Sequence, residues 1–115
     1  MLGPRYAPAH PGALVRETIE GLSEETGQPQ TLTRLARALG MTRKTLSALV
    51  NQRHRVTPEI ALRLAAGFQN TTAYFWMRVQ QDYDLAQARK RVSTDQVSVL
   101  WPLRPGPVSD PAPKW

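Results

Sequence analysis

The sequence predicts an all-α fold of five helices, and three observations support that fold class. Apolar residues recur at helical spacing in five stretches of the chain, which is the pattern of a helix with one buried side. Capping threonines or first-turn prolines begin these stretches, and Gly or Pro residues separate several of them. At 115 residues, the chain is long enough for one domain with a modest core and a tail.

The expected helices follow one another without internal repeats. The first follows His10-Pro11-Gly12 and ends before a turn over 26–31. Two short helices with a tight turn between them occupy 31–52. Thr57-Pro58-Glu59 combines an N-cap, a first-turn proline and an acid near the positive helix end, so it starts a fourth helix. The fifth helix is expected over about 72–90.

These helices form one predicted domain over 10–91, and the segments on either side lack its periodicity. Residues 1–9 are expected to be a flexible N-terminal arm. Residues 92–115 are expected to be a Pro-rich tail, with a candidate short strand over 97–101 and disorder after it. Addition of a strand to a partner protein and no role at all are the two alternatives for this segment. The two tryptophans of the tail favour a role in binding a partner.

The most informative pattern of the sequence lies between Leu32 and Arg53, in the stretch LTRLARALGMTRKTLSALVNQR. Ala36 is small where two helices would approach each other, and Gly40 follows four residues later, where the chain must reverse with a positive φ. Thr42 then stands as the N-cap of a second helix. This spacing is typical of a helix-turn-helix, whose second helix lies in the DNA major groove.

The charge distribution also indicates nucleic acid. The formal net charge is +6, and residues 31–55 contain six Lys and Arg residues and no Asp or Glu. Such an acid-free basic run is the electrostatic footprint of a protein that binds a polyanion. The alternative is a solvated charged face, which usually mixes Glu with the Arg residues.

The helix geometry assigns eight polar residues of this region a role in binding DNA. Residues on the outer face of the second helix reach base edges, whereas cations on its flanks and the residue at its N-terminus contact phosphates. The predicted base contacts are Arg43, Lys44, Ser47 and Asn51, and the predicted phosphate contacts are Thr42, Arg34, Arg53 and Arg55.

One short helix reads few base pairs, so a homodimer that binds two half-sites is expected. The last helix is long for so small a domain, and its aromatic face is the candidate dimer interface. That interface would comprise Phe75, Trp76, Val79 and Tyr83. The alternative is that these side chains complete the core of one monomer.

Nothing in the sequence indicates catalysis. His10 and His54 are not at metal-ligand spacing, and the chain has no Cys, no Gly-rich phosphate loop and no nucleophile elbow. We therefore expect no enzyme activity, no metal and no cofactor. No apolar run approaches a membrane span, so the sequence predicts a cytoplasmic protein, associated with the nucleoid when it binds DNA.

Four segments in order resemble the HigA-type antitoxins of bacterial toxin–antitoxin modules, which belong to the lambda-repressor-like, xenobiotic-response-element group of helix-turn-helix regulators. These segments are His10-Pro11-Gly12, LARALGMTRKTLSALVNQR, TPEIALRLAAGF and YFWMRVQQDYDLAQA. The resemblance covers about residues 10–88, and the helix-turn-helix alone would identify only the wider group. The HPG and the late aromatic segment point to the antitoxin branch.

The resemblance implies a five-helix lambda-repressor-like fold and a dimer formed through the last helix. It also implies two partners: a HigB-type toxin that is a ribosome-dependent mRNA interferase, and an operator in the module's own promoter. Residues 20–31 are longer than the usual link of the family, and Leu32 stands where many relatives have a phosphate-contacting Gln.

Two alternatives stay open at the level of sequence. A stand-alone or phage-type transcriptional repressor would need the same DNA-binding face but no toxin. An RNA-binding or purely protein-binding module would not need Arg43 and Lys44 for binding to promoter DNA.

Overall fold

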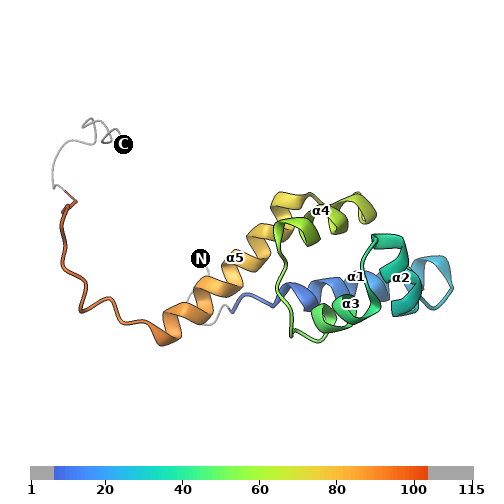
Figure 1. The fold of residues 1–115 in the computed structure, drawn as a ribbon, viewed down its shortest axis with the longest axis horizontal. Coiled ribbons are helices and arrows are strands. Elements are labelled where there is room, and N and C mark those ends of the chain that lie inside the picture. The colour runs from blue at the N-terminus through green and yellow to red at the C-terminus, as the bar shows by residue number, and fades with distance from the viewer. Residues whose placement is uncertain (1–6, 104–115) are drawn as a thin grey trace.

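The computed structural model describes residues 7–103, and within that range it contains five helices and no strand (Figure 1). The predicted all-α, five-helix fold is confirmed. The helices are α1 (Pro11–Thr26), α2 (Leu32–Leu39), α3 (Arg43–Val50), α4 (Pro58–Gly67) and α5 (Ala73–Arg91).

A side chain caps the N-terminus of every helix, which explains why the helices begin where they do. In each case the side chain accepts a hydrogen bond from a backbone N–H of the first turn, a group that has no partner inside the helix. The caps are His10, Thr31, Thr42, Thr57 and Thr72. The fifth helix therefore begins after Thr72, whereas the hydroxyl oxygen of Thr71 accepts a hydrogen bond from the Trp76 indole at 2.8 Å.

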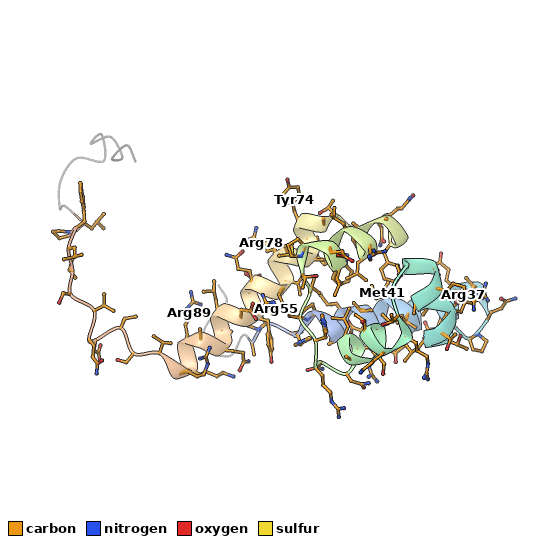
Figure 2. The ribbon with its side chains drawn as sticks, in the orientation of Figure 1. Arg37, Met41, Arg55, Tyr74, Arg78 and Arg89 are labelled. Atoms are coloured by element: carbon orange, nitrogen blue, oxygen red, sulfur yellow. The ribbon has the colours of Figure 1, made fainter. Side chains whose placement is uncertain are left out.

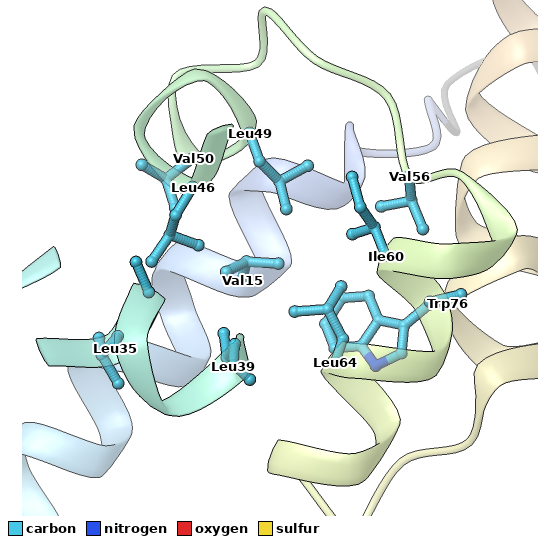
Figure 3. Packing of buried hydrophobic residues seen from close by; sticks show 12 residues of the cluster. Val15, Leu35, Leu39, Leu46, Leu49, Val50, Val56, Ile60, Leu64 and Trp76 are labelled. Carbon is cyan, nitrogen blue, oxygen red and sulfur yellow. The ribbon is translucent and has the colours of Figure 1, made fainter. Parts of the chain in front are cut away.

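Buried side chains from all five helices meet in one core (Figure 3). Val15 of α1, Leu46 and Leu49 of α3 and Leu64 of α4 are completely buried, and Trp76 of α5 is 1% exposed. α1 passes so close to α3 that a Cβ atom at Gly12 would overlap the Leu49 carbonyl group. The glycine of the HPG sequence therefore permits close contact between α1 and α3.

His10 caps α1 from a buried position. Its Nδ1 accepts the Gly12 N–H at 2.9 Å, and its ring packs edge-on against Tyr83 of α5, with 4.9 Å between ring centroids. Burial lowers the pKa of His10 from its ordinary value of 6.5, and the nearby carboxylate of Asp84 partly opposes that shift. The neutral imidazole is the form that can accept the capping hydrogen bond.

We predict that His10→Asn reduces the pH dependence of stability on the acidic side of neutrality. A folded-state pKa below the unfolded value means that the unfolded chain binds more protons, so this contribution to stability is present above pH 6.5 and is lost as the pH falls through the folded pKa. Asn can still cap the helix but does not titrate. The melting temperatures of the wild type and of His10→Asn should diverge as the pH is lowered below 6.5. Melting temperatures that fall in parallel would contradict a titrating cap.

α5 continues beyond the other helices, and the chain after it leads away from them (Figure 1). Residues 92–103 form no helix and no strand, so the candidate strand over 97–101 was wrong. The described helical body offers no strand with which this segment could pair. Its apolar side chains are exposed, and Leu100 and Leu103 are more than nine-tenths exposed. The predictions for an arm over 1–9 and for disorder after 101 lie largely outside the described residues.

Candidate nucleic-acid interface

A tight turn at Gly40 joins α2 to α3. Gly40 has a φ of 70°, in the left-handed region that favours glycine, and the Met41 N–H donates to the Ala36 carbonyl at 2.9 Å. This bond satisfies a carbonyl at the end of α2 and reverses the chain. The predicted turn at Gly40 is therefore confirmed.

α3 has one buried and one outward face. Leu46, Leu49 and Val50 are buried beneath it. Arg43 and Lys44, in its first turn, are exposed and make no ion pair within residues 7–103. Ser47 is half-buried one turn later. The two cations among the predicted base-contacting residues therefore lie together at one exposed end of α3.

Two arginines from other helices bind the α2–α3 turn and the C-terminal end of α3, and sequence reasoning gave neither of them a role. Arg63 of α4 donates from Nη1 to the Gly40 carbonyl at 2.8 Å, and it also pairs with Glu59 at 3.1 Å. Arg16 of α1 donates from Nη2 to the Val50 carbonyl at 3.1 Å. These contacts join residues 23 and 34 positions apart, so no local sequence signal could have identified them.

Two residues predicted to contact DNA already have hydrogen-bond partners within the protein. The Thr42 hydroxyl donates to Thr45 Oγ1 at 2.9 Å and accepts the Thr45 N–H at 3.1 Å. Asn51 ends α3: its Nδ2 donates to the Ser47 carbonyl at 2.9 Å, and its Oδ1 accepts from Arg16 Nη2 at 3.0 Å. The Thr42 hydroxyl would have to give up its hydrogen bond to Thr45 Oγ1 in order to donate one to a phosphate, whereas the contacts of Asn51 with Ser47 and Arg16 fix the orientation of its amide group.

The predicted phosphate-contacting arginines fall into two groups. Arg34 on α2 and Arg53 after α3 are exposed, without an ion pair within residues 7–103. Arg55 instead pairs with Asp84 of α5 at 2.9 Å. Asp84 also accepts from Gln80, whose Oε1 accepts the Val56 N–H at 2.6 Å. Arg55 therefore helps to attach the loop after α3 to α5.

The four residues predicted as a dimer interface do not share one exposed face. Trp76 is 1% exposed and lies in the core of this chain, so the interface prediction was wrong for this side chain. Tyr83 is half-buried and packs against His10, and its role in an interface stays a prediction. Positions 76, 80 and 83 recur at helical spacing, and that face of α5 is turned toward the core. Phe75 is 44% exposed and Val79 is half-buried.

Comparisons with known proteins agree with this architecture. A helix-turn-helix family model matches residues 18–75, from within α1 to the first turn of α5. Virulence-associated protein A' of Dichelobacter nodosus is 34% identical over 94 residues, which span 82% of this chain and 76% of the relative. The family is one of DNA-binding regulators and not a family of enzymes. Within residues 7–103, no helix has the length and apolar character needed to cross a bilayer.

Two solved structures extend the similarity beyond the helix-turn-helix. An addiction-module antidote protein of the HigA family from Coxiella burnetii is 31% identical, with a TM-score of 0.62 over 75% of this chain and 87% of the other. Antitoxin HigA of Pseudomonas aeruginosa, solved with higBA promoter, is 31% identical, with a TM-score of 0.60 over 72% and 84%. This chain therefore belongs to the helix-turn-helix family, of the xenobiotic-response-element type, and its structural likeness is to HigA-type antitoxins.

Proposed function

We propose that this protein is an antitoxin that neutralises a HigB-type mRNA interferase and represses its own operon by binding operator DNA as a homodimer. The observation that carries the proposal is the extent of the similarity to HigA antitoxins, which continues beyond the residues 18–75 common to the whole family. A generic helix-turn-helix regulator would need to match only that shared segment.

The DNA-binding part of the proposal rests on the exposed end of α3. Arg43 and Lys44 are the base-reading cations, with Ser47 deeper on the same helix, and Arg fits the two acceptors of guanine in the major groove. Arg34 and Arg53 are exposed on either side of α3 in sequence and contact phosphates. DNA-contact roles for Thr42, Asn51 and Arg55 stay predictions, because each of these side chains has an internal partner.

The size of this surface supports the homodimer. α3 has eight residues, so one copy can read only a few base pairs. Two copies related by a two-fold axis would read two half-sites, and each would increase the effective concentration of the other on DNA.

The toxin part of the proposal is tested by co-expression. A HigB-type toxin encoded beside this gene should arrest growth when expressed alone, and this protein should rescue growth and retain the toxin in a pull-down. Rescue with retention supports an antitoxin. Binding to the upstream promoter without rescue would instead favour a stand-alone repressor.

Binding to the same promoter DNA distinguishes an antitoxin or a stand-alone repressor from an RNA-binding or protein-binding module. The protein should shift duplex from its own promoter at lower concentration than a random duplex of equal length. Equal affinity for both duplexes, unchanged by replacing Arg43 and Lys44 with Ala, would remove DNA recognition from the proposal.

A further inference from the structure

The turn that ends α3 contains a strained residue. Gln52 has a φ of 61°, and it is the one residue other than glycine with a positive φ within residues 7–103. It follows Asn51 at the C-terminal end of α3, a position that glycine commonly fills in this left-handed conformation. A side chain there crowds the backbone, so glutamine is less favourable than glycine at this position.

The surrounding contacts hold this turn in one conformation. The Gln52 N–H donates to the Leu49 carbonyl at 3.0 Å, and the Arg53 N–H donates to the Ala48 carbonyl at 2.8 Å. Farther along the same loop, Arg55 lies beside α5, to which an ion pair attaches it (Figure 2). A strained conformation persists where neighbouring contacts fix it in this way, and such positions are concentrated at functional sites.

The side-chain amide of Gln52 is available to a ligand. It is exposed and makes no hydrogen bond within residues 7–103. The amide of Asn51 differs, because its Nδ2 donates to the Ser47 carbonyl and its Oδ1 accepts from Arg16. Gln52 therefore presents an acceptor oxygen and an NH₂ donor to solvent at the end of α3, where Asn51 is held by the protein itself.

A free amide at this place fits one DNA base in particular. In the major groove, adenine presents its N7 as an acceptor and its N6 amino group as a donor, and glutamine can bind both at once. A phosphate needs only a donor, and the exposed Arg53, next in the chain, supplies several donors with a positive charge. Gln52 thus offers a contact to adenine that the neighbouring arginine does not.

We propose that Gln52 is a specificity-determining residue of this protein, whose side-chain amide binds the major-groove edge of an adenine in each half-site. This inference rests on the operator binding proposed above. It extends the base-reading surface from Arg43, at the N-terminal end of α3, to the turn at the opposite end. Recognition of DNA then explains why a glutamine stands where a glycine would relieve the strain.

Two substitutions separate the amide from the backbone. Gln52→Gly removes the strain and the side chain, so the Tm should rise by a few degrees while affinity for the promoter duplex falls at least about fivefold. Gln52→Met keeps an unbranched side chain and the left-handed backbone, so the Tm should stay close to that of the wild type while affinity falls by a similar factor. Neither variant changes the charge, so the slope of the salt dependence should be unchanged in both.

Fluorescence anisotropy with promoter and random duplexes, at matched salt concentrations, measures affinity, and circular dichroism measures the Tm. Gln69→Met is the matched control, because Gln69 is an exposed glutamine between α4 and α5, and it should change neither quantity. Single adenines of the promoter duplex are then replaced with 7-deazaadenine, which lacks the N7 acceptor. One such replacement in each half-site should weaken binding of the wild type but not of Gln52→Met.

The outcomes separate this inference from the proposed function. If Gln52→Gly alone lost affinity, the backbone of the turn would matter and not the amide, so base reading by Gln52 would be overturned. Equal losses on promoter and random duplex would also overturn it, because a contact to the DNA backbone has that effect. So would unchanged affinity in both variants while the wild type still prefers its promoter. A wild-type protein with no preference for its promoter would instead overturn the operator binding of the proposed function.

Discussion

Trp76→Ala is expected to lower the free energy of unfolding by about 3–5 kcal/mol, a large part of the stability of a domain this size. The side chain is 1% exposed, its indole N–H donates to Thr71, and its ring lies 6.5 Å from that of Phe68 and 5.1 Å from that of Phe75, centroid to centroid. Truncation removes this packing and leaves a cavity where the helices meet. Chemical denaturation followed by circular dichroism measures the loss.

Phe75→Ala is the matched control, because it truncates the neighbouring aromatic side chain, which is 44% exposed. We expect it to lower the free energy of unfolding by about 1 kcal/mol, because Phe75 buries less apolar surface than Trp76 does. If the Trp76→Ala protein kept wild-type stability but became monomeric, Trp76 would belong to the dimer interface, and its place in the core would be contradicted.

Arg43→Ala is expected to lower affinity for the promoter duplex by about 1–3 kcal/mol and to leave affinity for random duplex much less changed. Arg43 is the first residue of α3, is exposed and has no ion pair within residues 7–103, so its guanidinium is available to a base edge. Fluorescence anisotropy with both duplexes, at matched salt concentrations, measures this difference.

Arg53→Ala is the control for that experiment. It removes an exposed cation beyond the end of α3, so it should weaken binding to both duplexes similarly and reduce the slope of the salt dependence by about one. Equal losses on promoter and random duplex for both variants would contradict the division between base and phosphate contacts. Arg55 is a poorer control, because Arg55→Ala also breaks the ion pair with Asp84.

Local sequence was sufficient to predict most of the helices and the turn between α2 and α3. The threonine caps at Thr31, Thr42 and Thr57 act within three residues of themselves, and Gly40 adopts its positive φ for reasons of local geometry. The exposure of Arg43 and Lys44 also follows locally, because the apolar stripe of α3 is turned to the core and these residues lie outside it.

Only the tertiary structure decided which arginines already have partners in distant parts of the chain. Arg63 at the α2–α3 turn, Arg16 at the end of α3 and Arg55 on α5 all bind groups far away in sequence. The same applies to α5, where the aromatic residues indicate a buried or interfacial helix but not the direction in which each one faces. Packing against α1 and α4 turns Trp76 inward and leaves Phe75 partly outward, because adjacent residues lie about 100° apart around a helix and only one of them can face the core.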